Sequence, residues 1–458
     1  MLATLRSLPR ALWLVLGLKV LESLSDFTLS LNLALYLSTA LGYSDAEASR
    51  VYAAWGVALG AWSIALGPTL DALGVRRSLL VGSALLAAGR LLLAATTSRV
   101  AAAMSLLVLQ SAGEALTATA LIVAVRRIVV NADDLPTAFA LYYATMQIGA
   151  IAAGFATDGT RALLPNAPAH VLTVLLWAVA VASIALFVAV ARTVPEYPSG
   201  ARAAHDEQRR CGREVRATCG DPVFRRLVVF VGVLAFVQTV WRHAIISLPK
   251  FMLRTMGSSA LYGLVSTINP LLVALTVTWV ARATAAYDAY SIMVAGALIA
   301  AFSPLVLYFA PPSYGALTLF LVALSAGEVL LQPRLIDFTL RLAPRGSEGM
   351  YSALANALLF VVRYLNDAET GLALQTFCAT DMTNDVAAAT PSFVRHCRGL
   401  WAEVFIYAIF SPLLLYALRP YLYSADVRRR VHADDGAGDS EKQQDDAVLG
   451  DVEIGNVK

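Results

Sequence analysis

Long apolar runs, repeated along the chain, constrain the fold of this sequence more than any other feature. A run of about twenty apolar residues can cross roughly 30 Å of hydrocarbon as an α-helix. Helices are the expected spanning form because lipid offers the backbone no hydrogen-bond partner. The runs also lack the strict alternation of a membrane barrel strand. Of 458 residues, 58% are hydrophobic and 15% charged, whereas a soluble domain carries about 25% charged residues. We therefore predict an all-α, multi-pass protein of the lipid bilayer.

The apolar runs predict twelve transmembrane helices. A polar, arginine-rich stretch at 194–222 separates the sixth span from the seventh. It predicts a cytoplasmic basic linker between a bundle at 1–193 and a second bundle at 223–423. Beyond Arg430 the chain turns acidic and polar, and residues 424–458 are predicted to be a disordered cytoplasmic tail. The twelve predicted spans are 11–39, 50–70, 78–96, 100–125, 136–157, 169–193, 224–247, 258–281, 289–310, 314–342, 347–375 and 399–419.

The distribution of basic residues predicts the orientation. Lys and Arg concentrate in the loops on the side of the N-terminus, which the positive-inside rule assigns to the cytoplasm. With twelve spans both termini are then cytoplasmic, in either the plasma membrane or an endomembrane. Cys378 and Cys397 fall in the last outer loop, where a disulfide or two free thiols are both possible. The net charge of +3 gives no support to nucleic-acid binding.

The two halves repeat each other at one constant offset. Residues 111–114 and 325–328 both read Ser-Ala-Gly-Glu, and with the same offset Gly82 and Gly296 begin matching segments of the third and ninth spans. Agreement in order across several helix pairs predicts a duplication. Parallel six-helix repeats, related by an axis normal to the membrane, place a binding site between the two halves.

The loop after the second span resembles the signature G-x-x-x-D-R-x-G-R-R of the major facilitator superfamily, with Ala72 in place of the first basic residue. The resemblance implies the major facilitator fold, with two pseudo-symmetric six-helix bundles. It also implies that this loop latches the inner gate and does not bind substrate. At a helix end, a carboxylate such as that of Asp71 is expected to accept from the N-terminus of a neighbouring helix. The matching residues are Gly67, Asp71, Gly74, Arg76 and Arg77.

A second resemblance lies in the tenth span. Residues 327–333 and 342–344 are similar to the G-E-L-x-L-x-P…L-A-P pattern of proton-coupled oligopeptide transporters. The resemblance implies proton symport, with Glu328 near the amino group of the substrate. Lys19 and Ser23 stand where that family has the first acid and the arginine of its E-x-x-E-R motif, and Glu22 is kept. Shorter similarities occur at 35–37, 248–251 and 268–270.

Charged residues inside the spans are the candidates for function, since each costs about 2.5 kcal/mol or more in hydrocarbon. One interpretation places them in a polar mid-membrane site that binds substrate and exchanges protons. The structural interpretation is that opposite charges neutralise each other inside the bundle, since Lys19 with Glu22 and Arg363 with Asp367 have the helical spacing of local pairs. The candidates for substrate binding or proton coupling are Glu22, Asp26, Glu114, Arg242, Glu328, Tyr36 and Asn269. The candidates for structural charge pairs are Lys19, Arg90, Arg363 and Asp367.

Taken together, the residues and the resemblance predict a secondary active transporter of a small polar organic solute, peptide-like or amino-acid-like. The proton is the expected coupling ion, with no cofactor or metal, and the expected state is a monomer. No sequence motif of a membrane enzyme is present. Two alternatives stay open: a facilitative uniporter or exchanger on the same fold, and a membrane sensor or scaffold that does not transport.

Overall fold

The computed structural model of the chain describes residues 9–129, 135–164, 168–194, 218–284, 286–342, 348–379 and 390–429. Within these residues the regular structure is helical throughout. Most of the predicted linker at 194–222 and the predicted tail after residue 429 lie outside the described residues. The predicted disordered tail begins too early, because residues 425–429 are helical and Val427 is buried in the core of the second half.

Each predicted span corresponds to one helix or to one interrupted helix, so the all-α prediction of twelve spans is confirmed. The first half contains α2 (Arg10–Thr39), α3 (Asp45–Leu73), α4 (Val75–Ala95), α5 (Arg99–Met104), the π-helical η1 (Ser105–Gln110), α6 (Ser111–Ile128), α7 (Leu135–Leu163) and α8 (Pro168–Thr193). The second half contains α10 (Pro222–Met256), α11 (Tyr262–Ser266), α12 (Ile268–Ala283), α13 (Ala289–Phe302), α14 (Pro304–Phe309), α15 (Tyr314–Leu342), α16 (Glu348–Phe377), α17 (Pro391–Ala417) and α18 (Arg419–Leu422).

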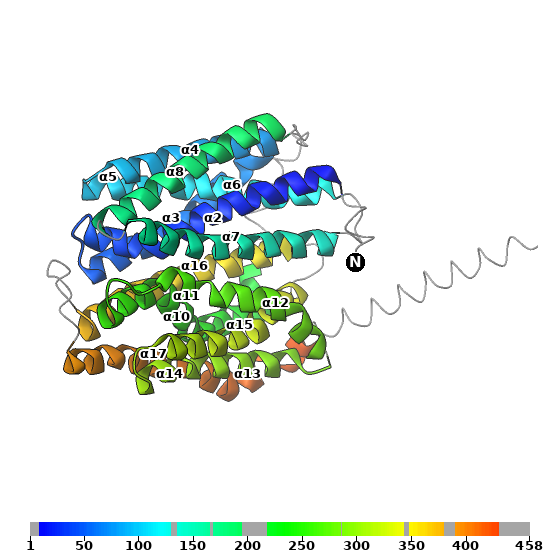
Figure 1. Cartoon of the computed structure of the whole chain (residues 1–458). Helices are drawn as coiled ribbons and strands as arrows, with labels where there is room; N and C mark the ends of the chain where they lie inside the picture. The colour runs from blue at the N-terminus through cyan, green and yellow to red at the C-terminus, as the bar shows by residue number, and fades with distance from the viewer. Residues whose placement is uncertain are drawn as a thin grey trace, which may run out of the picture.

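The helices of the two halves pack in the same pattern (Figure 1). In the first half α2 packs on α7 and α8, and α4 packs on α6 and α8. In the second half the corresponding α10 packs on α16 and α17, and α13 packs on α15 and α17. Between the halves, α3 contacts α16 and α7 contacts α11 and α12, while α2 meets α10. A pseudo-twofold axis that relates the two halves maps the contact of α3 with α16 onto the contacts of α7 with α11 and α12, and maps the contact of α2 with α10 onto itself.

Two pairs of glycines at repeated positions of the sequence form equivalent helix contacts in the two halves. A Cβ atom at Gly113 would lie 2.7 Å from the carbonyl oxygen of Gly82, and one at Gly327 would lie 2.7 Å from that of Gly296. The two pairs join α4 to α6 and α13 to α15, the equivalent helices of the two halves. Small residues let membrane helices approach to backbone contact. The duplication therefore preserves a close helix crossing in each half.

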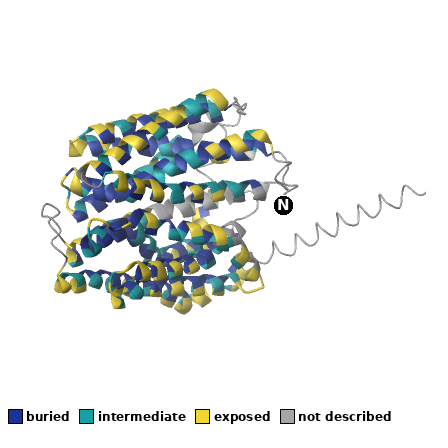
Figure 2. Cartoon of the chain, viewed as in Figure 1, coloured by how far each residue is buried: buried dark blue, intermediate teal, exposed yellow. Residues whose placement is uncertain are grey.

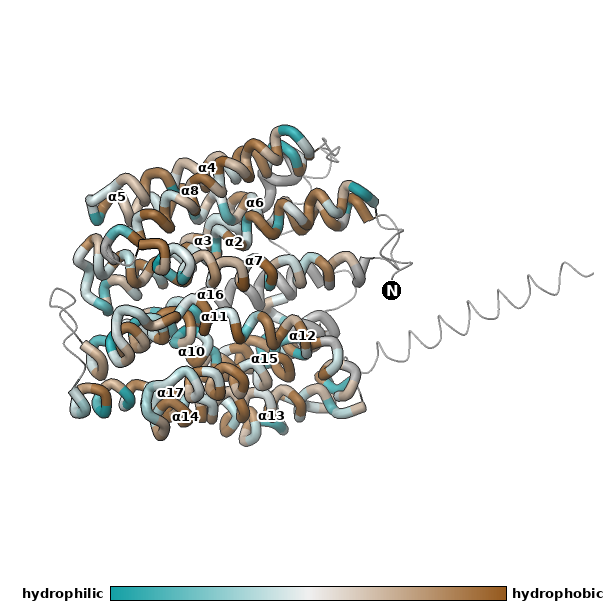
Figure 3. Tube along the Cα trace, viewed as in Figure 1, coloured by the Kyte–Doolittle hydropathy of each residue, from teal (hydrophilic) through white to brown (hydrophobic). Residues whose placement is uncertain are grey.

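The outside of the bundle is apolar. Figure 3 shows hydrophobic residues along most of the helices, and Figure 2 shows that the helices expose part of this surface. Leu275 is 67% exposed, Trp279 71% and Tyr416 75%. Seven helices of the described chain are long and apolar enough to cross a membrane by length and composition alone. An apolar surface of this extent is expected to face lipid.

Several spans are interrupted where the site is built. In the fourth span, the π-helical turn η1 directly precedes α6, and such turns often occur at functional sites. In the eighth span, α11 ends before Thr267 and α12 begins with Ile268, followed by Asn269 and Pro270. Proline cannot donate the backbone hydrogen bond of a continuous helix. The break therefore leaves Asn269 in the first turn of α12.

Candidate functional site

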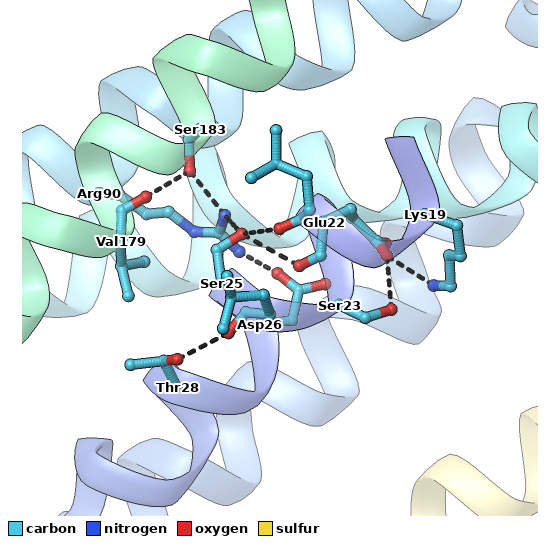
Figure 4. Close-up of polar contacts among 11 residues, drawn as sticks. Lys19, Glu22, Ser23, Ser25, Asp26, Thr28, Arg90, Val179 and Ser183 are labelled. Atoms are coloured by element: carbon cyan, nitrogen blue, oxygen red, sulfur yellow. Dashed lines mark hydrogen bonds and ion pairs between the residues drawn. The ribbon is translucent and has the colours of Figure 1, made fainter. Parts of the chain in front are cut away.

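A buried charge cluster lies where α2 meets α4 and α8 (Figure 4). Lys19 Nζ lies 2.5 Å from Glu22 Oε2 on the same face of α2. Arg90 of α4 donates to Asp26, and it also donates to Ser183 Oγ of α8 at 2.6 Å. Glu22 and Arg90 are each at most 2% exposed. The cluster contains two cations and two carboxylates, so it is electrically balanced, and Asp26 has Arg90 as its partner.

Glu114 of α6 lies between this cluster and the second half of the chain. Its charge neighbours are Glu22 and Asp26 of α2, Arg90 of α4 and Arg363 of α16. Its Oε2 atom is buried and forms no hydrogen bond with the residues that the structure describes. Leaving a buried polar atom without a partner costs about 1–3 kcal/mol of stability. This carboxyl would therefore be stabilised by a proton, a cation or a ligand group.

Two arginines of the second half face one carboxylate. Arg242 of α10 holds Asp367 of α16 through Nε to Oδ1 and through Nη2 to Oδ2 at 3.0 Å. Arg363 lies one helical turn from Asp367, but its Nε is 4.0 Å from Oδ2 and the contact is not a hydrogen bond. The ring of Tyr52, on α3 of the first half, lies 5.5 Å from Arg242 Cζ. Arg242, a candidate substrate ligand from the sequence, therefore has Asp367 as its partner.

Glu328 of α15 is held by neutral donors from two other helices. Trp241 Nε1 of α10 donates to Glu328 Oε2 at 2.8 Å, and Asn269 Nδ2 of α12 donates to the same oxygen at 2.9 Å. Asn269 Nδ2 also contacts Ser325 Oγ at 3.0 Å. Among the described residues no cation pairs with this carboxylate, and Tyr143 of α7 approaches it from the opposite half. The structure thus brings together Glu328 and Asn269, two of the candidates named from the sequence.

A further polar contact ties α10 to α16 inside the second half. His243 Nε2 lies 3.1 Å from Glu369 Oε2, and the same oxygen accepts from Thr239 Oγ1 at 2.9 Å. His243 is fully buried. These contacts involve residues of one half, and they stabilise the packing of that half.

At the end of the bundle where α2 ends and α3 begins, an ion cluster joins the two halves. Asp45 Oδ1 accepts from Lys250 Nζ of α10 at 2.7 Å and from Arg254 Nη2 at 3.0 Å. Lys250 also donates to Ser38 of α2 at 2.6 Å. Burial alone raises the pKa of Asp45, but the charges and hydrogen bonds of Lys250 and Arg254 outweigh burial and hold that pKa below its ordinary value of 3.8. We call these residues, Ser38, Asp45, Lys250 and Arg254, the latch.

Other contacts close the same end. Asp158 of α7 accepts from the backbone N–H of Leu264 at 2.6 Å, and Arg161 donates to the carbonyl of Ala260. Tyr262 donates to Asn32 at 2.7 Å. All side-chain hydrogen bonds between described residues of opposite halves fall at or toward this end. The structure therefore holds the two halves closed here. The latch was not predicted from the sequence. Lys250, an ammonium beside Pro249 in an apolar helix, was its available signal.

The sequence model of the Major Facilitator Superfamily matches residues 15–365, which is most of the chain. The chain belongs to the Major Facilitator Superfamily. The search of curated proteins finds no significant match.

Solved structures of similar fold confirm the architecture of this superfamily member. One is described as a proton dependent oligopeptide transporter, with a TM-score of 0.71 and 15% identity over 92% of this chain and 99% of that chain. A bacterial homologue of the human drug peptide transporters PepT1 and PepT2 gives a TM-score of 0.67 and 15% identity over 90% and 98%. A POT family transporter in complex with 5-aminolevulinic acid gives 0.68 and 14% over 91% and 97%. At these identities the likeness shows the fold alone.

The superfamily signature loop is only partly described. Gly67 and Asp71 lie in the last turns of α3, where the side chains are outside the described residues. Gly74 has a φ of 79°, a left-handed conformation that favours glycine, and it begins the turn into α4. Arg76 Nη2 donates to the carbonyl of Ala191 at the end of α8 at 3.1 Å, and Arg77 is exposed beside it. Arg76 thus ties this loop to another helix of its own half.

The remaining candidates of this superfamily member have structural contacts. Tyr36 donates its hydroxyl to the carbonyl of Leu93 at 3.1 Å, and it is buried in the core of the first half. Cys378 and Cys397 form a disulfide between the ends of α16 and α17. The pairing that the sequence left open is therefore present, whereas the structure gives Tyr36 a backbone partner at the end of α4.

Proposed function

We propose that this protein is a secondary active transporter that carries a small polar organic solute together with protons by alternating access. The single observation that carries the proposal is the environment of Glu328. Its carboxylate is oriented by Trp241 and Asn269 without a cation from the described part of the chain, at a point where Tyr143 approaches from the other half. A carboxylate in the membrane interior calls for a proton or a cationic ligand. A solute ammonium group and a proton are the two species that can alternate there.

The chemistry of the neighbours in fold is consistent with this site. Oligopeptides, the substrates of one of these transporters, and 5-aminolevulinic acid, bound in another, each carry an amino group and a carboxylate. We infer that the solute of this chain is of the same peptide-like or amino-acid-like class. In the predicted orientation the latch closes the outer side, so the structure corresponds to a conformation that is closed to the outside.

The test is uptake of labelled dialanine into proteoliposomes, with and without an inwardly directed proton gradient. We expect the gradient to drive uptake in the wild type, and Glu328→Gln to abolish accumulation because a neutral amide cannot exchange protons. Asp426→Asn is the matched control, since it removes one carboxylate from a side chain that is 65% exposed. Uptake that does not depend on the gradient and that persists in Glu328→Gln would instead indicate a facilitative transporter. Binding without uptake would indicate a sensor.

A further inference from the structure

Arg363 differs from the other cations inside the bundle. Lys19 lies at Glu22, Arg90 at Asp26 and Arg242 at Asp367, each with a carboxylate at hydrogen-bond distance. Lys250 and Arg254 share the carboxylate of the latch in the same way. Arg363 donates no hydrogen bond to a described residue. Its Nε atom is buried, while the side chain as a whole is 37% exposed.

The position of Arg363 places its guanidinium between the halves. The residue belongs to α16, yet a Cβ atom added at Gly56 of α3 would lie 3.8 Å from Arg363 Cδ and Nε. Tyr52, one turn earlier on α3, and Glu114 of α6 are charge neighbours of the same guanidinium. Elements of both halves therefore surround Arg363, and any group it binds contacts both.

Three buried polar groups without a hydrogen bond to a described residue lie around the guanidinium of Arg363, counting its own Nε. The hydroxyl of Tyr52 is buried beside the guanidinium of Arg242, and Glu114 Oε2 and Arg363 Nε are buried as well, yet none of them has a partner with the geometry of a hydrogen bond among the described residues. Tyr52 is only 1% exposed. Buried polar groups are nearly always satisfied, so these groups have hydrogen-bonding capacity to offer a polar ligand. A carboxylate matches the two donors, because it can accept from a guanidinium fork and from a phenol at once.

We propose that Arg363, assisted by Tyr52, binds the carboxylate of the transported solute. This inference rests on the proposed function and names a group that the solute must carry. Glu328 would then hold the solute's amino group, and Arg363 its anionic end.

The charges around Arg363 also determine what accompanies the solute. Arg242 and Arg363 carry two positive charges, and Asp367 and Glu114 carry two negative charges when ionised. The groups beyond Glu114, on α2 and α4, are the balanced cluster of Lys19, Glu22, Asp26 and Arg90. A bound carboxylate adds one negative charge, and uptake of one proton from water by Glu114 restores neutrality. The neutral carboxyl can also donate its proton to the anion. Binding of the anion and protonation of Glu114 are therefore coupled one to one.

The first test compares acids with their methyl esters as ligands for the purified protein, by competition or thermal shift. The probes are dialanine and 4-aminobutyric acid, each against its ester. We expect the wild type to prefer the acid by about tenfold to a hundredfold, the range of a charge-assisted hydrogen bond. Arg363→Gln removes the preference and leaves the affinity for the ester unchanged, and Arg363→Lys restores part of it. Arg225→Gln, at an exposed position of α10, is the matched control.

The unchanged affinity for the ester shows that Arg363→Gln folds and keeps the rest of the site. A wild type without preference for either acid would overturn the inference, and so would an Arg363→Gln variant that keeps the preference or loses acid and ester alike. Failure of gradient-driven uptake with acid selectivity intact would refute the transport proposal alone.

The second test measures protons. In weakly buffered solution above neutral pH, binding of the acid to the wild type should take up about one proton more per ligand than binding of its ester, because any proton that the ammonium group displaces from Glu328 is common to both. In Glu114→Gln this difference disappears, while the acid still binds, because the amide stands in for the neutral carboxyl. An equal difference between acid and ester in the wild type and in Glu114→Gln would refute the coupling.

Discussion

Replacing Asp45 by Asn should open the end of the bundle that the latch closes. The side chain of Lys250 is fully buried and that of Arg254 is 4% exposed, and both depend on Asp45, itself only 8% exposed, for their counter-charge. The amide keeps the size of the carboxylate and removes the charge. In the closed conformation two buried cations then lose their carboxylate, whereas in the open conformation water can solvate them.

The magnitude follows from the burial of the latch. Removing one partner of a buried ion pair costs about 3–5 kcal/mol. At about 1.4 kcal/mol for each factor of ten, the closed conformation loses about a hundredfold to a few thousandfold relative to the open one. A closed population of about 90% would fall below about 10%.

Distances between spin labels at positions 50 and 259 can measure this opening, because Arg50 and Ser259 are exposed on opposite halves at this end. Cys211 and Cys219 are first replaced by Ser so that the labels are specific. We expect a longer distance in Asp45→Asn than in the wild type. The control is Glu47→Gln, which removes a carboxylate that is 43% exposed, two residues along the chain.

A second variant separates electrostatics from local damage. Asp45→Asn combined with Lys250→Met leaves Arg254, which still donates to the carbonyl of Cys378 at 2.6 Å. Only one uncompensated charge remains, so the double variant should open less than Asp45→Asn alone. The reasoning is refuted if Asp45→Asn and Glu47→Gln give the same distances, or if Lys250→Met makes the opening larger.

Two further predictions follow from the same structure. Because the closed conformation lowers the pKa of Asp45 below 3.8, its stabilisation is complete above the ordinary pKa and is lost only as pH falls through the lowered one. The spin-label distance at the latch should therefore be constant from about pH 5.5 to 7.5, and an opening within that range would show that another group controls this end. Gly327→Ala places a Cβ 2.7 Å from the carbonyl oxygen of Gly296 and should destabilise the protein by about 1–3 kcal/mol. Gly232→Ala meets nothing within 4 Å and should leave the thermal unfolding midpoint equal or higher.

Much of the fold could be predicted from the sequence because span length and apolarity are local properties. The boundaries of the predicted spans agree closely with helices such as α2 and α15. The internal repeat located the glycine crossings, since close backbone approach leaves a trace in residue type. The interruptions at η1 and at Thr267 were not predicted, although Pro270 was a signal for the second of them in the sequence.

The site was less predictable because charge partners depend on how helices rotate against one another. The sequence identified Arg242 and Arg363 as intramembrane charges and assigned the spacing of three or four residues to local pairs. In the structure Arg242, on another helix, is the hydrogen-bonded partner of Asp367. Arg363 lies 4.0 Å from the same carboxylate, as the local spacing predicted, but forms no hydrogen bond with a described residue. Glu328 and Asn269 were recognised together because each lay in a segment that resembled a family pattern.

The duplication explains how a symmetric scaffold can recognise an asymmetric solute. Glu114 and Glu328 occupy equivalent positions of the two halves, behind the same Ser-Ala-Gly sequence. Around Glu328 the partners are the neutral donors Trp241 and Asn269, so its negative charge remains available to a cation. Around Glu114 the neighbours include Arg363, so its negative charge can be exchanged for that of another anion. One acid thus favours an ammonium group and the other favours a carboxylate with a proton. A solute that carries both groups would bind across the interface in one orientation, because exchanging its ends would place like charges together.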